Sequence, residues 1–534
     1  MGFFNNLWWC KNCRVPLLQK ECEICGYEGV KLCSDLKPMF NEECRFLEKE
    51  SSKKLPGKGW QDGLWMRYKT IWFNGERLLR FSANGKPTAI KEYLNRDSSP
   101  KHCITPKTLY KANKSALDEL EKEAISFIKE IIKSYPERKP IVSFSGGKDS
   151  TVVSSLVRKA LETDGILHIF GNTTIEYPDT LNYIKKFSGN NIRIPFQENS
   201  SSHTFLEMCK LIEPPSRINA WCCSVFKGTP IATVVNKING NRGVISFEGI
   251  RKSESTRRMN RQRIYFNKKI VHQLSVYPIL EWREIDVWLY ILSMGLDFND
   301  AYNKGFNRVG CLYCPNNIPY NEYLIKIYCP EQSKKWYNFL VQYAKKIGKG
   351  DPQEYVESGA WKMRVGKSIG KSAAYIDKKP CTDGENINNY TLPKSFRSED
   401  FSERFKPFGK IIKIKDPIGY SYLVKDQHKG IPLFIFQGVD GFNRLRISLL
   451  VNSGRKRLLS AVERAIRRLQ VCILCGACTG ICPTGAIKIN PHFKIKTNNC
   501  IHCGKCSSTK FIKFSCVSLN SQQQSRRFSN VNRV

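Results

Sequence analysis

The stretch IVSFSGGKDS at residues 141–150 decides the fold of the middle of the chain. It begins with residues that favour a strand, passes through the turn Ser145-Gly146-Gly147-Lys148-Asp149-Ser150, and runs into a helical pattern from Thr151 to Leu161. The glycines let backbone N–H groups approach an anion closely, the helix N-terminus is positive, and Lys148 adds a full charge. The glycine spacing is not that of the Walker motif, so the sequence predicts a phosphate-binding loop of another kind.

Strand-like and helix-like segments alternate around this loop. ILHIF at 166–170 and VISF at 244–247 are further apolar runs, and residues 115–135 follow the helical period, with Ser115 as the expected N-cap. This order predicts an α/β fold in which βαβ units form a mostly parallel sheet. Such sheets bind ligands at the carboxyl ends of their strands.

Several of these segments resemble one protein family. SFSGGKDS resembles the PP-loop shared by ATP pyrophosphatases and the phosphoadenosine phosphosulfate (PAPS) and adenylyl-sulfate (APS) reductases. GNTTIEYPDT at 171–180, EGIRKSESTRR at 248–258 and the stretches 277–291 and 303–315 are similar to further motifs of the sulfonucleotide reductases, so the resemblance covers roughly residues 115 to 320. It implies a PP-loop core of the adenine nucleotide α-hydrolase type. It also implies an adenine nucleotide or sulfonucleotide as ligand, held by the glycine turn, Thr173 and Arg251.

Basic residues supply most of the catalytic candidates. Arg251, Arg257 and Arg258 suit the phosphate and sulfate of a substrate because guanidinium groups bind oxyanions with two parallel hydrogen bonds, although a solvated basic loop is an alternative. The resemblance adds Lys148, together with Lys227 in CCSVFKGTP, which falls on the family's lysine.

A nucleophilic cysteine is harder to find. In the reductases a cysteine in a Glu-Cys-Gly-(Leu/Ile)-His motif attacks the sulfur, and no such motif occurs here. Cys329 is the candidate substitute, with Cys381 as a second, because both follow the core where the family's nucleophile would be. For both cysteines, a buried or incidental thiol is the leading interpretation and the nucleophile the alternative.

Cys10-x2-Cys13 and Cys22-x2-Cys25 predict a zinc site at the N-terminus. Two such pairs can face each other and surround one tetrahedral ion, so the structural zinc ribbon is the leading interpretation, with an iron site or no metal as alternatives. A closed four-thiolate site has no open position for catalysis.

A second cysteine set lies within the region of family resemblance. Cys222 and Cys223 are adjacent, and Cys311-x2-Cys314 follows much later in the chain. The two pairs can hold one 4Fe-4S cluster if their loops meet, as the resemblance to assimilatory APS reductases implies. Zinc, or cysteines that only fill space, are the alternatives.

The C-terminal cysteines are typical of a ferredoxin with two clusters. Cys472-x2-Cys475-x2-Cys478-x3-Cys482-Pro483 has the bacterial ferredoxin spacing, and Cys500-x2-Cys503-x2-Cys506 repeats it. The resemblance implies that the last cysteine of each run binds the cluster of the other run. It assigns Cys472, Cys475, Cys478 and Cys516 to one 4Fe-4S cluster, and Cys482, Cys500, Cys503 and Cys506 to the other.

Length and composition indicate several domains and an anionic partner. The 534 residues exceed what one core usually serves, and the formal net charge is +38. There is no run of 18 apolar residues and no secretory signal pattern, so we expect a cytoplasmic protein with no membrane partner, in which paired cysteines bind metal.

Composition changes along the chain suggest six segments. We expect a zinc ribbon, a β-rich region with a hairpin at Asn74-Gly75, the PP-loop domain, a mixed region containing a linker at 379–402, a ferredoxin domain after a basic helix at 453–470, and a disordered tail. Their boundaries are 1–35, 36–114, 115–325, 326–460, 461–520 and 521–534.

The leading functional hypothesis is an iron-sulfur enzyme related to the PAPS and APS reductases. It would bind an adenine nucleotide and use electrons from a low-potential donor for sulfur chemistry, and the literal reaction would release sulfite. One alternative is a nucleotide-activated sulfur transferase that acts on RNA or DNA, favoured by the missing motif and the positive charge. Another is a redox-sensing or electron-transfer adaptor without catalysis.

Overall fold

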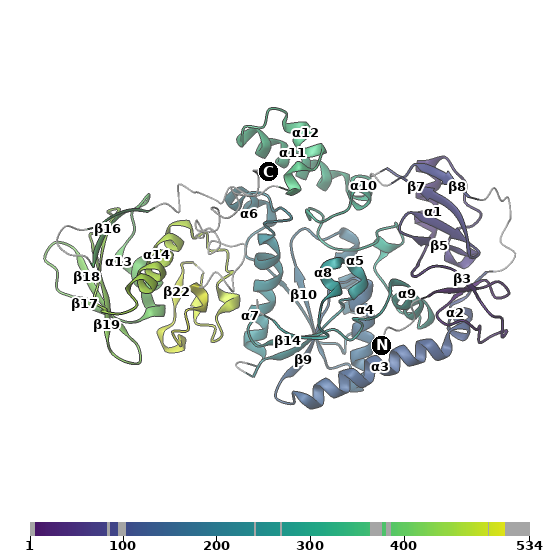
Figure 1. The fold of residues 1–534 in the computed structure, drawn as a ribbon, viewed down its shortest axis with the longest axis horizontal. Coiled ribbons are helices and arrows are strands. Elements are labelled where there is room, and N and C mark those ends of the chain that lie inside the picture. Colours follow the sequence, from purple (N-terminus) through teal and green to yellow (C-terminus); the bar gives the residue numbers. More distant parts are fainter. Residues whose placement is uncertain are drawn as a thin grey trace. The chain divides into compact units, whose positions relative to one another are not determined.

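The computed structural model describes residues 6–82, 86–93, 103–239, 242–267, 270–363, 376–380, 386–489 and 491–507 (Figure 1). The described residues form two compact units. The first lies within Met1–Asn199, Val244–Phe266 and Gln273–Lys346, and the second within Ser200–Gly243, Asn267–His272 and Ile347–Val534. No helix among the described residues is both long and apolar enough to cross a bilayer.

The first unit is built on a six-stranded sheet of order β11-β10-β9-β12-β14-β13. Strands β10, β9, β12 and β14 pair in parallel, and β13 at the edge pairs with β14 in the antiparallel direction. The strands are β9 Lys139–Ser143, β10 Leu167–Asn172, β11 Phe196–Ser200, β12 Val244–Glu248, β13 Ile264–Phe266 and β14 Gln273–Val276. The near-continuous apolar runs of β9 and β12 fit strands buried on both faces. The predicted α/β fold with a mostly parallel sheet is confirmed.

The helices of the first unit after the N-terminal strands are α2 Pro106–Ala112, α3 Lys114–Ser134, α4 Lys148–Leu161, α5 Pro178–Asn190, α8 Thr256–Met259, α9 Glu284–Ser293, α10 Pro319–Tyr328 and α11 Pro330–Lys346. Among them, α4 packs against β9 and β12 of this sheet (Figure 1). The prediction of Ser115 as an N-cap was wrong, because the buried Asn113 occupies that position and Ser115 donates its hydroxyl to Glu23. The helix after the glycine turn begins at Lys148, three residues before the predicted start.

Two small sheets precede the parallel one. The first comprises β1 Trp8–Cys10, β2 Val15–Leu17 and β3 Val30–Lys31, and the second comprises β4 Lys37–Pro38, β5 Leu64–Arg67, β6 Thr70–Phe73, β7 Glu76–Phe81 and β8 Ala89–Glu92, beside α1 Asn41–Ser51. Asn74 and Gly75 both have positive φ and connect β6 to β7 as predicted. The structure adds a strand before the predicted hairpin, since a further turn at Tyr68, with φ 54°, divides residues 64–81 into three strands.

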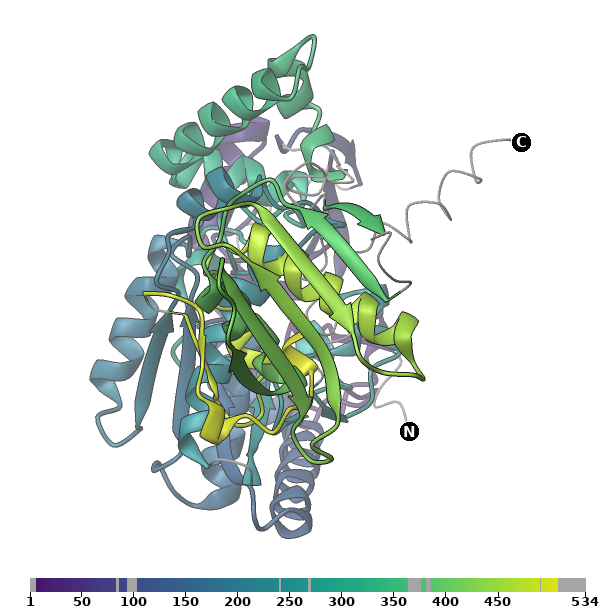
Figure 2. The ribbon, with the colours of Figure 1, turned by 90° about the vertical axis from the view of Figure 1, so that its left-hand side faces the viewer.

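The second unit contains a six-stranded antiparallel sheet of order β15-β16-β20-β19-β18-β17 (Figure 2). Its strands are β15 Asp377–Pro380, β16 Ile387–Thr391, β17 Gly409–Ile414, β18 Tyr420–Asp426, β19 Pro432–Gly438 and β20 Arg444–Leu449. α13 Ser398–Phe405 and α14 Arg455–Val471 bury apolar side chains in the same core as this sheet. The predicted linker at 379–402 was wrong because this segment contains β16, whose polar residues alternate with the buried Tyr390.

The rest of the second unit consists of α6 Phe205–Ile212, a π-helical turn at Cys223–Gly228, α7 Thr229–Ile238, α12 Pro352–Glu357, and the small strands β21 Ile487–Lys488 and β22 Lys494–Ile495. The basic helix predicted at 453–470 is present as α14, and it ends directly before Cys472.

Candidate functional site

The glycine turn lies where two parallel strands end. Ser143 at the end of β9 pairs with Glu248 at the end of β12, so the turn and the segment after Glu248 leave the sheet at the same edge. Gly249 approaches the turn so closely that an added methyl group would lie 2.6 Å from the Asp149 carbonyl carbon. The carboxyl edge of the sheet therefore brings the two predicted anion-binding segments together.

Hydrogen bonds fix the shape of the turn. Gly146 has φ +71°, which favours glycine, and Ser150 Oγ donates to the Gly147 carbonyl at 2.8 Å. Asn299 Nδ2 donates to the Gly146 carbonyl at 3.1 Å, and the Lys148 backbone N–H donates to the Tyr302 hydroxyl at 3.1 Å. Hydrogen bonds within the turn and hydrogen bonds to Asn299 and Tyr302 thus both stabilise its conformation.

Buried charges surround the start of α4. Lys148 Nζ lies 3.2 Å from Asp149 Oδ2 and 3.6 Å from Glu284 Oε1, and Arg251 Nε donates to Asp149 Oδ1 at 2.6 Å. Burial alone would raise the pKa of Asp149, but Arg251 and Lys148 outweigh it and lower this pKa to about 2. Asp149 is therefore a fixed negative charge that orients both cations.

A second group of cations lies near this network. Burial, followed by the charges of Arg308 and Arg261, lowers the pKa of Arg258 to about 10. Arg308 directly precedes Val309, whose side chain would lie 3.2 Å from a methyl group added at Gly147. Glu254 pairs with Arg258, and a bound anion would relieve the remaining repulsion among the guanidinium groups. The side chain of Arg257 lies outside the described residues.

Thr173 connects the nucleotide motif to one of the predicted cluster cysteines. Its hydroxyl donates to Glu176 Oε1 at 2.6 Å and lies 3.4 Å from Cys311 Sγ. The Leu312 backbone N–H donates to the Ile175 carbonyl at 2.8 Å, so the Cys311–Cys314 turn packs on the loop after β10. This half of the predicted core cluster therefore lies beside a predicted nucleotide residue.

Tyr177 gives a test of whether a cluster fits there. Its hydroxyl is buried and has no hydrogen-bond partner among the described residues, and burial together with the nearby Cys311 and Cys314 raises the pKa of Tyr177. A buried hydroxyl without a partner is costly, and sulfur atoms of a cluster could accept its hydrogen bond. The pair Cys222 and Cys223 belongs to the second unit, so the four-cysteine set stays a prediction.

The N-terminal cysteines do converge. One ligand atom from each of Cys10, Cys13, Cys22 and Cys25 lies within 4.8 Å of every other. Burial raises the pKa of Cys10 to about 11, whereas the hydrogen bond from the Tyr27 backbone N–H is the largest of the effects that lower the pKa of Cys25 to about 7 despite burial. Four thiols this close cannot all ionise without a cation between them, so the site fits a metal ion.

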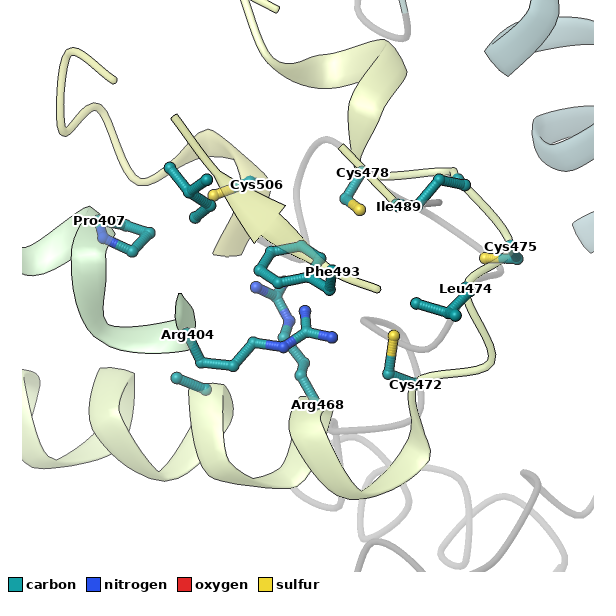
Figure 3. Close-up of a pocket in the computed structure, with 13 residues that line it drawn as sticks. Arg404, Pro407, Arg468, Cys472, Leu474, Cys475, Cys478, Ile489, Phe493 and Cys506 are labelled. Carbon is teal, nitrogen blue, oxygen red and sulfur yellow. The ribbon is translucent and has the colours of Figure 1, made fainter. Parts of the chain in front are cut away.

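The ferredoxin cysteines line two adjoining cavities in the second unit, and Figure 3 shows the first of them. The first is lined by Cys472, Cys475, Cys478 and Cys506 among others. The second is lined by Cys482, Cys500, Cys503 and Cys506 among others. The second cavity brings together the four cysteines predicted for one cluster, and the first brings together three of the other four. Cys516 lies outside the described residues, so both complete ligand sets stay predictions.

The remaining catalytic candidates are less informative. Cys329 is 5% exposed and burial raises the pKa of its thiol, which opposes formation of a nucleophilic thiolate. Lys227 is exposed in the second unit, and Cys381 lies outside the described residues. Sequence reasoning gave no role to Glu284 or Tyr302, which contact Lys148. The sequence offered one indication of their importance. Glu284 lies within the stretch 277–291 and Tyr302 directly precedes the stretch 303–315, both of which resemble motifs of the reductases.

Comparison with known proteins agrees with this geometry. Residues 139–317 match the model of the phosphoadenosine phosphosulfate reductase domain. The match covers about a third of the chain. Residues 469–488 match the model of the 4Fe-4S binding domain, which covers the first ferredoxin run of cysteines.

Curated proteins similar to this chain include an uncharacterised protein and a reductase. An uncharacterised protein of Methanocaldococcus jannaschii is 34% identical over 261 residues, which are 48% of this chain and 52% of that protein. The adenosine 5'-phosphosulfate reductase of Staphylococcus epidermidis is 22% identical over 209 residues, 39% of this chain and 82% of that protein. The chain thus spans about half the length of the first relative.

Solved structures include the PAPS reductase of Candida auris in complex with phosphate. It is 15% identical, with a TM-score of 0.27, over 37% of this chain and 95% of that chain.

Proposed function

We propose that the protein binds a sulfonucleotide at the glycine turn and reduces it with electrons supplied through its C-terminal clusters. The observation that carries this proposal is the buried set Lys148, Asp149 and Arg251 at the carboxyl edge of the sheet, beside Thr173 and Cys311. Anion-binding groups and a potential cluster ligand meet there in one part of the first unit.

The anionic end of the substrate would lie between two sets of cations. Lys148 is held between two carboxylates and Arg251 is held by Asp149, so neither side chain loses much conformational freedom when a phosphate binds. Arg258 and Arg308, whose charges repel each other, would take the second oxyanion group. This division distinguishes a sulfonucleotide from a nucleoside with one anionic group.

The second unit offers a route for electrons. Cys222 and Cys223 lie at the start of the helical segment that continues into α7. The loop of the first ferredoxin run packs on α7, because a methyl group added at Gly476 would lie 3.3 Å from Thr229 Cγ2, and one at Gly480 would lie 3.0 Å from Ala232 Cβ. The tandem cysteines and the first ferredoxin cavity therefore share one packed element.

The proposed reaction breaks the S–O bond between sulfate and nucleotide. Sulfur goes from the +6 to the +4 state by taking two electrons, sulfite forms, and the nucleotide phosphate leaves with the bridging oxygen. When bound, the 4Fe-4S clusters supply these electrons one at a time from an external low-potential donor. Arg251 and Lys148 would stabilise the charge on the departing phosphate.

Anaerobically reconstituted protein should be incubated with APS or PAPS and a low-potential donor, and sulfite should be measured. We expect sulfite with at least one of the two nucleotides and none with a Lys148→Met variant whose clusters are intact. Absence of sulfite in wild-type protein that holds all clusters contradicts the proposal.

Sulfur transfer to a nucleic acid is a second candidate, favoured by one surface feature. Tyr68 is 84% exposed at the β5–β6 turn, and the guanidinium of Arg67 lies 5.5 Å from its ring centroid. Exposed aromatic and basic pairs can stack on single-stranded bases. ATP consumption and RNA binding that weakens steeply with salt, both without sulfite, would support this candidate instead.

A further inference from the structure

The two ferredoxin cavities differ in charge. The first cavity is lined by Arg404 and Arg468 as well as by cysteines, whereas no residue that lines the second cavity is charged. Both arginines are buried, with 8% and 4% of their surface exposed. A guanidinium remains protonated in proteins, so two positive charges are enclosed beside the first cysteine set. A charge that acts on Cys500 in the second set is that of Lys406, which is paired with Glu403.

Arg404 reaches the cavity from the end of α13. Its guanidinium carbon lies 3.6 Å from the centroid of the Phe493 ring, and both side chains lie in the cavity with the cysteines of the first run (Figure 3). Its Nε has no hydrogen-bond partner, and Arg404 has no carboxylate partner, among the described residues. A buried cation is costly unless it is paired, so this site calls for an anion.

Arg468 reaches the same cavity from the last turn of α14. It lies four residues before Cys472, and both residues line the first cavity. Figure 3 shows its side chain extending into the cavity toward the same space as that of Arg404. The position of this cation is therefore fixed by the helix that leads into the first ferredoxin run.

A 4Fe-4S cluster with four thiolate ligands supplies the missing anion. The cluster becomes more negative by one charge when it is reduced, so a nearby cation stabilises the reduced form more than the oxidised form. Burial strengthens the effect because the local dielectric constant is low. The cavity fits a cluster by its donor set, and its two guanidinium groups fit a cluster that accepts an electron easily.

We propose that Arg404 and Arg468 raise the reduction potential of the cluster at Cys472, Cys475 and Cys478 above that of the cluster at Cys482, Cys500, Cys503 and Cys506. One electron then moves from the second cluster, which is oxidised, to the first, which is reduced, and the external donor restores the second. This inference rests on the proposed function for the presence of both clusters.

The surroundings of the two cavities agree with this direction. Cys503 is exposed and Ile501 is 56% exposed, so an external donor can approach the second cavity. Gly476 and Gly480 in the first run pack on α7, which continues the segment of Cys222 and Cys223. Electrons that enter at the second cavity would thus leave from the first toward the tandem cysteines.

The test is a potentiometric titration of the anaerobic full-length protein, followed by EPR. Arg404→Gln and Arg468→Gln remove the charges, Arg404→Lys and Arg468→Lys keep them, and Arg457→Gln removes an exposed charge at the other end of α14. We expect each Gln variant to lower one midpoint by at least the 59 mV that corresponds to a tenfold change in a one-electron equilibrium. The other midpoint, the Lys variants and the control should stay near wild type.

A Cys503→Ser variant assigns the signals, because Cys503 lines only the second cavity. The signal that remains in this variant must belong to the higher midpoint of wild type. Equal midpoints in wild type, the opposite order, or Gln variants that hold both clusters with unchanged midpoints overturn the inference. If a Gln variant fails to assemble its cluster, the order of the two midpoint potentials in the wild-type protein decides whether the inference holds. Absence of both signals from wild type contradicts the proposed function instead.

Discussion

Lys148 is the buried cation on which the proposed nucleotide binding depends most directly. It is 3% exposed and lies between Asp149 and Glu284, with its backbone N–H on Tyr302. Lys148→Met should weaken nucleotide binding by at least tenfold, about 1.4 kcal/mol, because the charge is lost from a preorganised site. Calorimetric titration with APS and ATP measures this.

Lys159→Met is the matched control, because Lys159 lies on the same helix but pairs with Glu121. Equal loss of affinity in both variants would mean that the effect comes from α4 as a whole and not from the phosphate loop.

Protonation of the Asp35 carboxyl group should change the stability of the protein within a pH range in which unfolding can be measured. Its carboxylate accepts the backbone N–H groups of Glu284 and Ile285, and burial, followed by the charge of Glu284, raises the pKa of Asp35 to about 6. A carboxyl group whose pKa is raised on folding stabilises the fold below its unfolded pKa and loses this contribution as pH rises through its folded pKa. Relative to Asp35→Asn, wild type should therefore lose about 2 kcal/mol between about pH 4 and pH 7.

Thermal unfolding of the two proteins at several pH values measures this difference. A melting-temperature difference that stays constant between pH 5 and pH 7 would show that Asp35 does not titrate as described.

At the residue scale the sequence pointed to the candidate anion-binding groups but not to the residues that contact them. The glycine turn, Lys148, Arg251 and Thr173 could be found because a motif carries them. Glu284, Tyr302 and Asn299 could not, because their contacts with the turn are made only when segments about 135 to 155 residues apart in the sequence pack together.

Asn113 is the contact that joins the N-terminal strands to the helices of the first unit. It is fully buried, accepts the Leu18 backbone N–H at 2.7 Å, and donates to the carbonyls of Pro16 and Leu109 at 3.0 and 3.1 Å. Asn113→Ala leaves these backbone groups without partners and should cost about 2 to 4 kcal/mol, with faster metal loss from the cysteine ribbon.

Competition with a chromogenic chelator measures that metal loss. Ser115→Ala is the control, since its bond to Glu23 is exposed and should matter little. Unchanged metal release in Asn113→Ala would show that the ribbon does not depend on this contact.

At the scale of elements, hydrophobic pattern predicted the strands that are buried on both faces and the long amphipathic helices. It missed β16, because INNYT contains few apolar residues and its burial comes from the neighbouring β20. It also missed the turn at Tyr68, because a positive φ at tyrosine has no sequence signal.

Across the whole molecule, the metal sites should respond independently. The cysteine ribbon belongs to the first unit and the two ferredoxin cavities to the second. Removal of the ribbon's metal by a chelator should therefore change nucleotide affinity or stability of the first unit while the visible absorption of the clusters persists. Loss of cluster absorption in parallel with metal loss, at equal rates, would contradict this independence.

The most direct measurement of the proposed function is a single turnover without an external donor. Protein whose clusters have been reduced and freed of reductant is mixed with APS or PAPS, and rapid-freeze EPR and sulfite are recorded together. The account predicts that the reduced-cluster signals disappear as sulfite forms, with two electrons lost per sulfite and no change on addition of AMP. Clusters that remain reduced while the sulfonucleotide is bound, with no sulfite formed, would contradict it.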